Sequence, residues 1–331
     1  MVVLDPRDVE RKVLAILRIV AASPQAVGAR RIAAVLAEQG ILLTERAVRY
    51  HLQLMDERGL TLQVGREGRV ITERGRREAA SALVADKVGY VIGRINQLAF
   101  QTTFDPAAGE GNVVMNTALF RQDAFSAALE AMRPAFRAGL ATSDRVALAS
   151  PGERLGTLTV PAGLVGFSTV CSVTVNGVLL KAGIPMDSRF GGILELAGRR
   201  ALRFVELIHY SGSSLDPSEA FIRARMTDVL SAVHDGYGRL LANFRELPAM
   251  CRSLAQDTIA ALQQAGIGGI VELGEISEPI CQVPVDVNVC GLVLLGGLNP
   301  VAAAAEAGHP AEYRAMSTIM PWSALRSVWD L

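Results

Sequence analysis

The stretch TERAVRYHLQLMDERGLTLQVGREGRVIT, residues 44–72, determines how the first part of this chain folds. Thr44 is a favoured helix N-cap and Gly59 a favoured helix terminator, so the pattern predicts a helix between them. The apolar residues of this helix recur at the spacing of one helical face: Val48, Leu52 and Met55. Segments 60–64 and 69–72 then flank a polar turn bounded by glycines, which predicts a β-hairpin.

Two further helices are predicted upstream, over residues 8–21 and 28–39, because apolar residues recur there at helical spacing. Three short helices followed by a hairpin are the pattern of a winged helix-turn-helix domain, which we assign to residues 1–80. Long polar side chains on the third helix, at the start of the second and on the wing are placed to contact DNA. These candidate DNA-binding residues are Arg30, Arg31, Arg46, Arg49, Tyr50, Gln53, Arg66 and Arg69. The alternative is a winged helix that makes only protein contacts, with its arginines in solvent.

Charge is distributed unevenly along a chain of 331 residues whose formal net charge is zero. Residues 1–80 hold 14 arginines and lysines against ten acids, and the remainder holds 19 against 23. A basic first part fits contact with nucleic acid, while the larger second part fits another role. A single winged helix reads a short half-site, so we expect a homodimer.

Other functional classes lack their signatures. No apolar run is long enough to span a bilayer and the N-terminus does not look like a signal peptide, so we expect a cytoplasmic protein with no membrane contact. The four histidines form no metal-binding motif, and the four cysteines form no CxxC and lie among apolar residues. The sequence contains neither GxSxG nor a Walker A motif. We therefore expect no catalytic residue, no metal and no cofactor.

The second part contains an internal repeat, at about 111–185 and 238–310. Segments 166–185 and 291–310 align without a gap, and both end in Ala-Gly-x-Pro. Each copy reads as strand, helix, strand, strand, helix, with Thr174 and Asn299 expected to cap the last helix. We expect two copies packed about a pseudo-twofold axis, the alternative being chance similarity. The fold class is then α/β (α+β): a winged helix followed by a larger α/β sensor domain with an internal duplication.

A small polar loop precedes a predicted helix at Asp216-Pro217. Glycine and serine at a helix N-terminus offer free N–H groups and hydroxyls to an anion such as a carboxylate or phosphate. The alternative is an ordinary turn between a strand and a helix.

Four stretches together carry a resemblance to a known family. They are TVNGVLLKAGIPMDSRFGG (174–192), YSGSSLDPSEAFI (210–222), GYGRLLANFRELP (236–248) and GLVLLGGLNPVAAAAEAG (291–308). The chain resembles the NrpR-type transcriptional regulators, with one NrpR domain over residues 84–331. The resemblance implies a repressor that binds operator DNA as a dimer and is controlled by a small metabolite such as 2-oxoglutarate.

The candidate ligand-binding residues are polar residues of these matching stretches. They are Arg189, Ser213, Ser214, Asn243 and Asn299. The guanidinium of Arg189 has the geometry to pair with a carboxylate through two hydrogen bonds. Two other hypotheses stay open: a metabolite-binding protein or enzyme of unknown reaction whose winged helix makes protein contacts, and a purely structural oligomerisation protein.

Overall fold

The structure is a computed structural model that describes residues 6–23, 25–38, 41–65, 67–80 and 90–331. It separates into two units, Met1–Lys87 and Val88–Leu331, which are called here the head and the body. Each unit is described by itself below. Among the described residues, no helix combines the length and the apolar character needed to cross a bilayer.

The head contains helices and one hairpin, in the order α1 (Pro6–Ala22), α2 (Ala29–Glu38), α3 (Glu45–Glu57), β1 (Thr61–Val64), β2 (Gly68–Ile71) and α4 (Glu73–Ala80). The predicted winged helix is confirmed, with α4 as an addition. The Thr44 side chain caps α3 by accepting from the Ala47 N–H at 3.2 Å. Gly59 follows the helix with a φ of +69°, a conformation that glycine adopts without strain.

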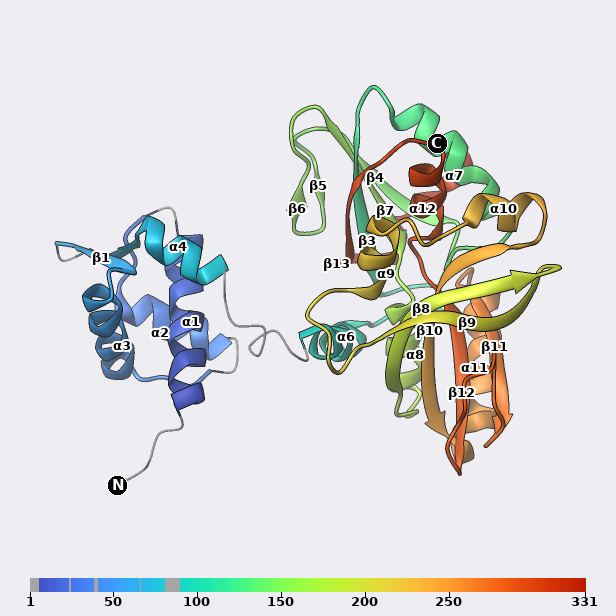
Figure 1. Cartoon of the computed structure of the whole chain (residues 1–331), viewed down its shortest axis with the longest axis horizontal. Coiled ribbons are helices and arrows are strands. Elements are labelled where there is room, and N and C mark those ends of the chain that lie inside the picture. Colours follow the sequence, from blue (N-terminus) through green and yellow to red (C-terminus); the bar gives the residue numbers. More distant parts are fainter. Residues whose placement is uncertain (1–5, 24, 39–40, 66, 81–89) are drawn as a thin grey trace. The chain divides into compact units, whose positions relative to one another are not determined.

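The body is built around two five-stranded sheets (Figure 1). Its first half contains α6 (Tyr90–Gln101), β3 (Asn112–Arg121), α7 (Phe125–Arg137), β4 (Arg145–Ala149), β5 (Arg154–Leu155), β6 (Leu158–Thr159), β7 (Leu164–Val170), α8 (Val173–Lys181), β8 (Asp187–Ala197), β9 (Arg200–His209), α9 (Pro217–Arg223) and α10 (Val229–His234). Its second half contains β10 (Gly238–Pro248), α11 (Arg252–Gln264), β11 (Ile270–Ile276), β12 (Val289–Leu295), α12 (Asn299–Glu306), β13 (Glu312–Pro321) and β14 (Arg326–Ser327).

The two halves exchange strands. The strand order is β13-β3-β7-β4-β14 in the first sheet and β11-β12-β10-β8-β9 in the second. The strand that follows α8, which is β8, thus lies beside β10 of the second half. The strand that follows α12, which is β13, lies beside β3 of the first half. Neither sheet is complete without a strand from the other half, so the halves form one folding unit.

The register of the sheets is also the same in both halves. Asn116 of β3 lies opposite Thr169 of β7, and Asn243 of β10 lies opposite Leu294 of β12. The repeat makes both pairs equivalent, because GNVVMN (111–116) matches GRLLAN (238–243) and segment 166–185 aligns with 291–310. We propose that the halves arose by duplication of one unit, and the matching register and strand exchange support this proposal.

Two pairs of helices complete the body, with α7 beside α12 and α8 beside α11 (Figure 1). The expected caps of α8 and α12 are wrong, because the residues before these helices are Ser172 and Leu298 and neither makes a side-chain cap. Thr174 instead accepts from the Val114 N–H at 3.0 Å. Asn299 accepts from the Leu241 N–H at 2.8 Å and donates to the Leu241 carbonyl at 3.0 Å. Both side chains tie a helix to its neighbouring strand.

Candidate functional site

Helix α3 presents a polar face to solvent. Its apolar residues Val48, Leu52 and Met55 are fully buried, which fixes the opposite face outward. The predicted DNA-binding residues of this helix are all exposed: Arg46, Arg49, Tyr50 and Gln53. Arg49 pairs with Glu45 and Gln53 donates to Glu57 at 3.5 Å, both on the helix surface. Such exposed pairs contribute little stability, so the side chains can exchange partners for phosphates or base edges.

Two predicted arginines begin helix α2. Arg30 and Arg31 are exposed in its first turn, which contains no acidic residue. Cations at the positive end of a helix are unfavourable by a few tenths of a kcal/mol up to about 1 kcal/mol. A bound phosphate would remove this penalty, which favours a backbone contact at this turn.

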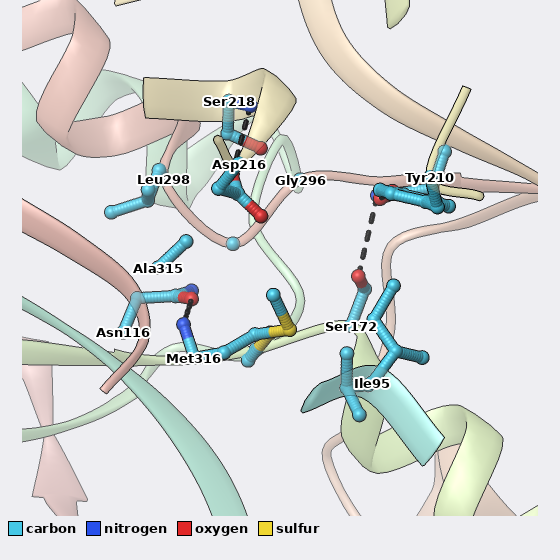
Figure 2. A pocket seen from close by; sticks show the side chains of 14 residues that line it. Ile95, Asn116, Ser172, Tyr210, Asp216, Ser218, Gly296, Leu298, Ala315 and Met316 are labelled. Carbon is cyan, nitrogen blue, oxygen red and sulfur yellow. Dashed lines mark hydrogen bonds between the residues drawn. The ribbon is translucent and has the colours of Figure 1, made fainter. Parts of the chain in front are cut away.

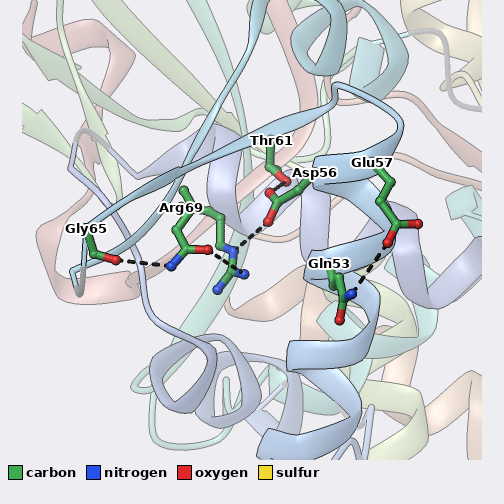
Figure 3. A network of polar contacts seen from close by, with 7 residues as sticks. Gln53, Asp56, Glu57, Thr61, Gly65 and Arg69 are labelled. Carbon is green, nitrogen blue, oxygen red and sulfur yellow. Dashed lines mark hydrogen bonds and ion pairs between the residues drawn. The ribbon is translucent and has the colours of Figure 1, made fainter.

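A polar network fixes the wing to α3 (Figure 3). The Arg69 guanidinium bonds Asp56 at 3.1 Å and reaches Gln63 at 3.4 Å, while the Thr61 hydroxyl donates to the other Asp56 oxygen at 2.6 Å. The Arg69 side chain is only 18% exposed, so it positions the hairpin more than it offers a free charge. Arg66, the other predicted wing residue, lies outside the described residues.

We predict that Asp56→Ala will loosen the wing. The change leaves the Arg69 guanidinium partly buried without its carboxylate and removes the Thr61 bond, at an expected cost of about 1–3 kcal/mol to the head. Chemical denaturation followed by circular dichroism would measure this loss, with Glu57→Ala as a control on the same helix. Equal loss in both variants would contradict the role assigned to the network.

His51 is the titratable group on the buried side of α3. It is 7% exposed, and its Nδ1 has no hydrogen-bond partner in the part of the chain that the structure describes. Burial lowers its pKa below the usual value, and the charge of Lys12 lowers it further. The folded head therefore favours the neutral imidazole.

Because the folded pKa of His51 lies below the unfolded value of about 6.5, acid must destabilise the head. The stability that neutral His51 contributes to the head is fully present above the unfolded pKa. It is lost as the pH falls from the unfolded pKa to the folded pKa. We predict that the melting temperature of the head falls between neutral pH and pH about 5. His51→Leu should make this fall smaller, and an identical pH profile in the variant would count against the prediction.

A small cavity lies in the body where the two halves meet (Figure 2). Its volume is about 20 Å³. It is lined by Ile95, Asn116, Cys171, Ser172, Val173, Tyr210, Asp216, Ser218, Asn243, Gly296, Gly297, Leu298, Ala315 and Met316. The lining includes equivalent positions of the two halves, Asn116 with Asn243 and the turn Cys171-Ser172 with Gly296-Gly297. The cavity therefore lies between matching segments of the two halves.

The two asparagines hold this junction together. Asn116 accepts from the Met316 N–H at 3.1 Å, and Met316 adopts a positive φ of 50°. Asn243 accepts from the Tyr210 hydroxyl and donates to the Ser172 hydroxyl at 3.3 Å. Each contact joins the first half to the second, so a change in the cavity would alter contacts of both halves.

A buried cation lies behind the cavity. Arg245 of β10 is 0% exposed, and its guanidinium donates to the Ser172 hydroxyl at 3.3 Å. Its Nε and one terminal nitrogen have no hydrogen-bond partner among the described residues, and burial lowers its pKa. Two ionisable groups, Tyr210 and Cys171, interact electrostatically with Arg245. Burial raises the pKa of both, and it raises the pKa of Cys171 to about 11. Both are neutral at neutral pH, so Arg245 has no described anionic partner.

Asp216 contributes a carboxyl group to the cavity wall. It caps α9 by accepting from the Ser218 N–H at 2.8 Å, which confirms the helix predicted to open at Asp216-Pro217. Burial, and then the charge of Glu219, raise the pKa of Asp216 to about 6. The carboxyl group therefore takes up a proton just below neutral pH.

Of the five predicted ligand-binding residues, the cavity brings in Asn243 alone. Arg189 pairs with Asp187 at 3.0 Å and Glu246 at 3.5 Å, and its side chain is 43% exposed. The Ser213 hydroxyl accepts a hydrogen bond from the Leu215 N–H of the same turn at 3.2 Å, and Ser214 is exposed. Asn299 is fully buried against Leu241.

Sequence reasoning did not place Asn116, Ser172, Tyr210 and Arg245 at the site, and it indicated Asp216 only as the start of the helix after the polar loop. The available signals were that loop and the repeat, in which GNVVMN (111–116) matches GRLLAN (238–243). Nothing local marks Arg245, which lies between Phe244 and Glu246 in a strand. Its burial results from strands distant in sequence.

An exposed recognition helix, a braced wing and a separate body that encloses a polar cavity define a class: transcriptional regulators with a DNA-binding winged helix and a regulatory domain. Comparison with known proteins agrees with this class. Residues 88–327 match the NrpR regulatory domains NRD1 and 2, and residues 14–79 match the ribonuclease R winged-helix domain. The chain belongs to the NrpR family of transcriptional regulators.

Three relatives are named as global nitrogen regulators. The global nitrogen regulator NrpRI of Methanosarcina mazei is 37% identical over 325 residues, covering 98% of this chain and 100% of that protein. Global nitrogen regulators NrpR of Methanocaldococcus jannaschii and Methanococcus maripaludis are 32% and 30% identical over 97% and 94% of this chain, which spans 56% and 54% of their lengths. A crystal structure of a nitrogen repressor-like protein from Methanococcus jannaschii covers 72% of this chain and 98% of its own, with a TM-score of 0.62 and 28% identity.

Proposed function

We propose that this protein is a nitrogen-responsive repressor that binds operator DNA as a dimer and is controlled by a small dicarboxylate, 2-oxoglutarate. The names of its relatives support the nitrogen response. The observation that carries the effector proposal is the buried, anion-free guanidinium of Arg245 behind the junction cavity. The function is regulatory and needs no catalytic step.

The head supplies the DNA contact. Helix α3 enters the major groove with Arg46, Arg49, Tyr50 and Gln53 toward the bases, while Arg30 and Arg31 hold phosphates. One such head reads a half-site, and two heads on a dimer read half-sites separated by about one or more helical turns of DNA. The dimer supplies the affinity that a single head lacks.

The cavity in its present form is too small for the effector. A volume of about 20 Å³ accommodates a water molecule but not a dicarboxylate. Binding must therefore enlarge the cavity, which changes the contacts of Asn116 and Asn243 while the exchanged strands keep the halves together. An effector that prefers the enlarged arrangement shifts the population toward it, and the dimer then holds its heads at a spacing that no longer fits the operator.

Arg245 is the residue we assign to the carboxylate. A guanidinium forms two parallel hydrogen bonds with a carboxylate, and its Nε and one terminal nitrogen are the atoms without partners. Ser172 and Asn243 both line the cavity, and the Ser172 hydroxyl accepts from the Arg245 guanidinium. Protonation of Asp216, whose pKa is about 6, removes the repulsion that its carboxylate would exert on the effector.

Gel shifts test this proposal. The full chain is mixed with fragments from upstream of its own gene, at low salt, with and without 2-oxoglutarate, and with succinate as a matched dicarboxylate. We expect a retarded band that weakens with 2-oxoglutarate and less with succinate. No band on any fragment would contradict operator binding, and a band that ignores 2-oxoglutarate would contradict the effector.

A further inference from the structure

Five arginines gather at one end of the second sheet, around the turn that joins β8 to β9. They are Arg199, Arg200, Arg203, Arg225 and Arg239, and with the 61% exposed Tyr237 they are called here the arginine end. The Arg199 N–H donates to the Gly236 carbonyl at 2.8 Å, which brings the turn against the segment before β10.

Sheet register places these side chains together. Glu195 of β8 lies opposite Arg203 of β9 and Arg239 of β10, so the three residues share one face of the sheet. Arg200 lies opposite Ala197, two residues further along β8. Arg225 comes three residues before Asp228, which pairs with Arg239 in an isolated bridge.

Most of this charge is unpaired. Arg203 bonds Glu195 at 2.8 Å, and the other four arginines make no ion pair among the described residues. In the adjoining segment, Asp228 caps α10 by accepting from the Ser231 N–H, and Asp235 follows the same helix. The chain after residue 80 holds more acids than bases, 23 against 19, so this local excess of positive charge departs from its surroundings.

Two of the arginines adopt a backbone conformation that disfavours them. Arg199 has a φ of 65° in the β8–β9 turn, and Arg225 has a φ of 54° just after α9. Glycine or asparagine is the usual residue at both kinds of position. An arginine there costs about 1–2 kcal/mol, and neither side chain forms a hydrogen bond or ion pair within the described part of the chain that would offset this cost.

We propose that the arginine end contacts the sugar–phosphate backbone of DNA, outside the segment that the winged helix reads. Exposed guanidinium groups without carboxylate partners match phosphate oxygens in geometry and charge, and the exposed tyrosine hydroxyl adds a further donor. The contact is independent of sequence and lengthens the DNA that one protein covers. It rests on DNA binding by the chain, since the head brings the body close to the duplex.

The test compares two triple variants of the full chain. Arg199→Ala/Arg200→Ala/Arg239→Ala removes three unpaired arginines of the arginine end. Arg154→Ala/Arg314→Ala/Arg326→Ala removes three exposed arginines without ion pairs elsewhere in the described body, and is the matched control. Fluorescence anisotropy measures binding to mixed-sequence duplex DNA over a salt series.

We expect the first variant to bind at least about ten-fold more weakly at low salt, and the slope of log K against log salt to fall by about 3, because each phosphate contact contributes about 0.9 to that slope. The control should match the wild type. A second comparison measures the head variant Arg46→Ala/Arg49→Ala with and without the three substitutions of the arginine end. The combined variant should have a smaller salt slope than the head variant. This comparison separates the two contributions, because the head variant alone tests the winged helix.

An unchanged slope in the first variant would overturn the proposal. A basic surface could instead bind an acidic face of a second copy of the chain. Sedimentation velocity tests this alternative, because it measures whether the first variant still forms a dimer. If the first variant became monomeric and kept the wild-type slope, the arginine end would be a protein interface and the proposal would be wrong.

Discussion

Replacing Arg46 and Arg49 together with alanine is expected to weaken operator binding by at least about a hundred-fold. Each good arginine contact to a base edge contributes about 1–3 kcal/mol of discrimination, and both side chains are exposed on the free face of α3. Neither packs in the head core, where Val48, Leu52 and Met55 lie. Folding should therefore be unaffected, and the thermal response of the body to 2-oxoglutarate should persist.

Gel shifts on the operator fragment measure the loss, and circular dichroism verifies the fold. Arg76→Ala/Arg77→Ala is the matched control, because it removes two exposed arginines of α4 and the same charge from the same unit. A loss of similar size in the control would mean that overall charge, not α3, determines DNA affinity. An unchanged operator shift in the α3 variant would contradict the assignment of the recognition helix.

Local signals explain why the head was predictable. Thr44, the apolar positions of α3 and Gly59 lie within one short segment, and each acts on its immediate neighbours. The hairpin register follows from its glycine-bounded turn in the same way. Helix α4 was not predicted, since Glu73–Ala80 is charged and offers almost no apolar face.

The body was predictable in outline because the two halves repeat one order of elements. The strand exchange was not, because pairing of β8 with β10 depends on contacts between residues far apart in sequence. The cavity follows from that exchange, which brings together Tyr210 and Asn243 with the turn at Ser172. The sequence indicated Arg189, a polar residue in a stretch that carries the family resemblance, whereas Arg245 reads as an ordinary strand residue between Phe244 and Glu246.

Replacing Arg245 with methionine is expected to raise the stability of the body and to remove its effector response. A buried cation without an anionic partner is destabilising, and an apolar residue of similar volume in such a position commonly stabilises by about 1–4 kcal/mol. For a body of this size the melting temperature should rise by at least about 2–4 °C. A residue present only for packing would show the opposite sign, since losing its contacts would lower the melting temperature.

The effector arm of the same experiment uses thermal shifts with 2-oxoglutarate. Loss of one member of a buried charge pair costs about 2–5 kcal/mol, so affinity should fall by at least about thirty-fold. Arg189→Met is the control, because Arg189 is half-exposed and already paired with Asp187 and Glu246. If Arg189→Met removed the response and Arg245→Met kept it, the carboxylate would bind at the site first indicated by the sequence. For Arg245→Met we expect higher stability together with a lost response to 2-oxoglutarate. Only an effector-binding cation produces this combination, because its charge destabilises the free protein and is neutralised by the bound carboxylate.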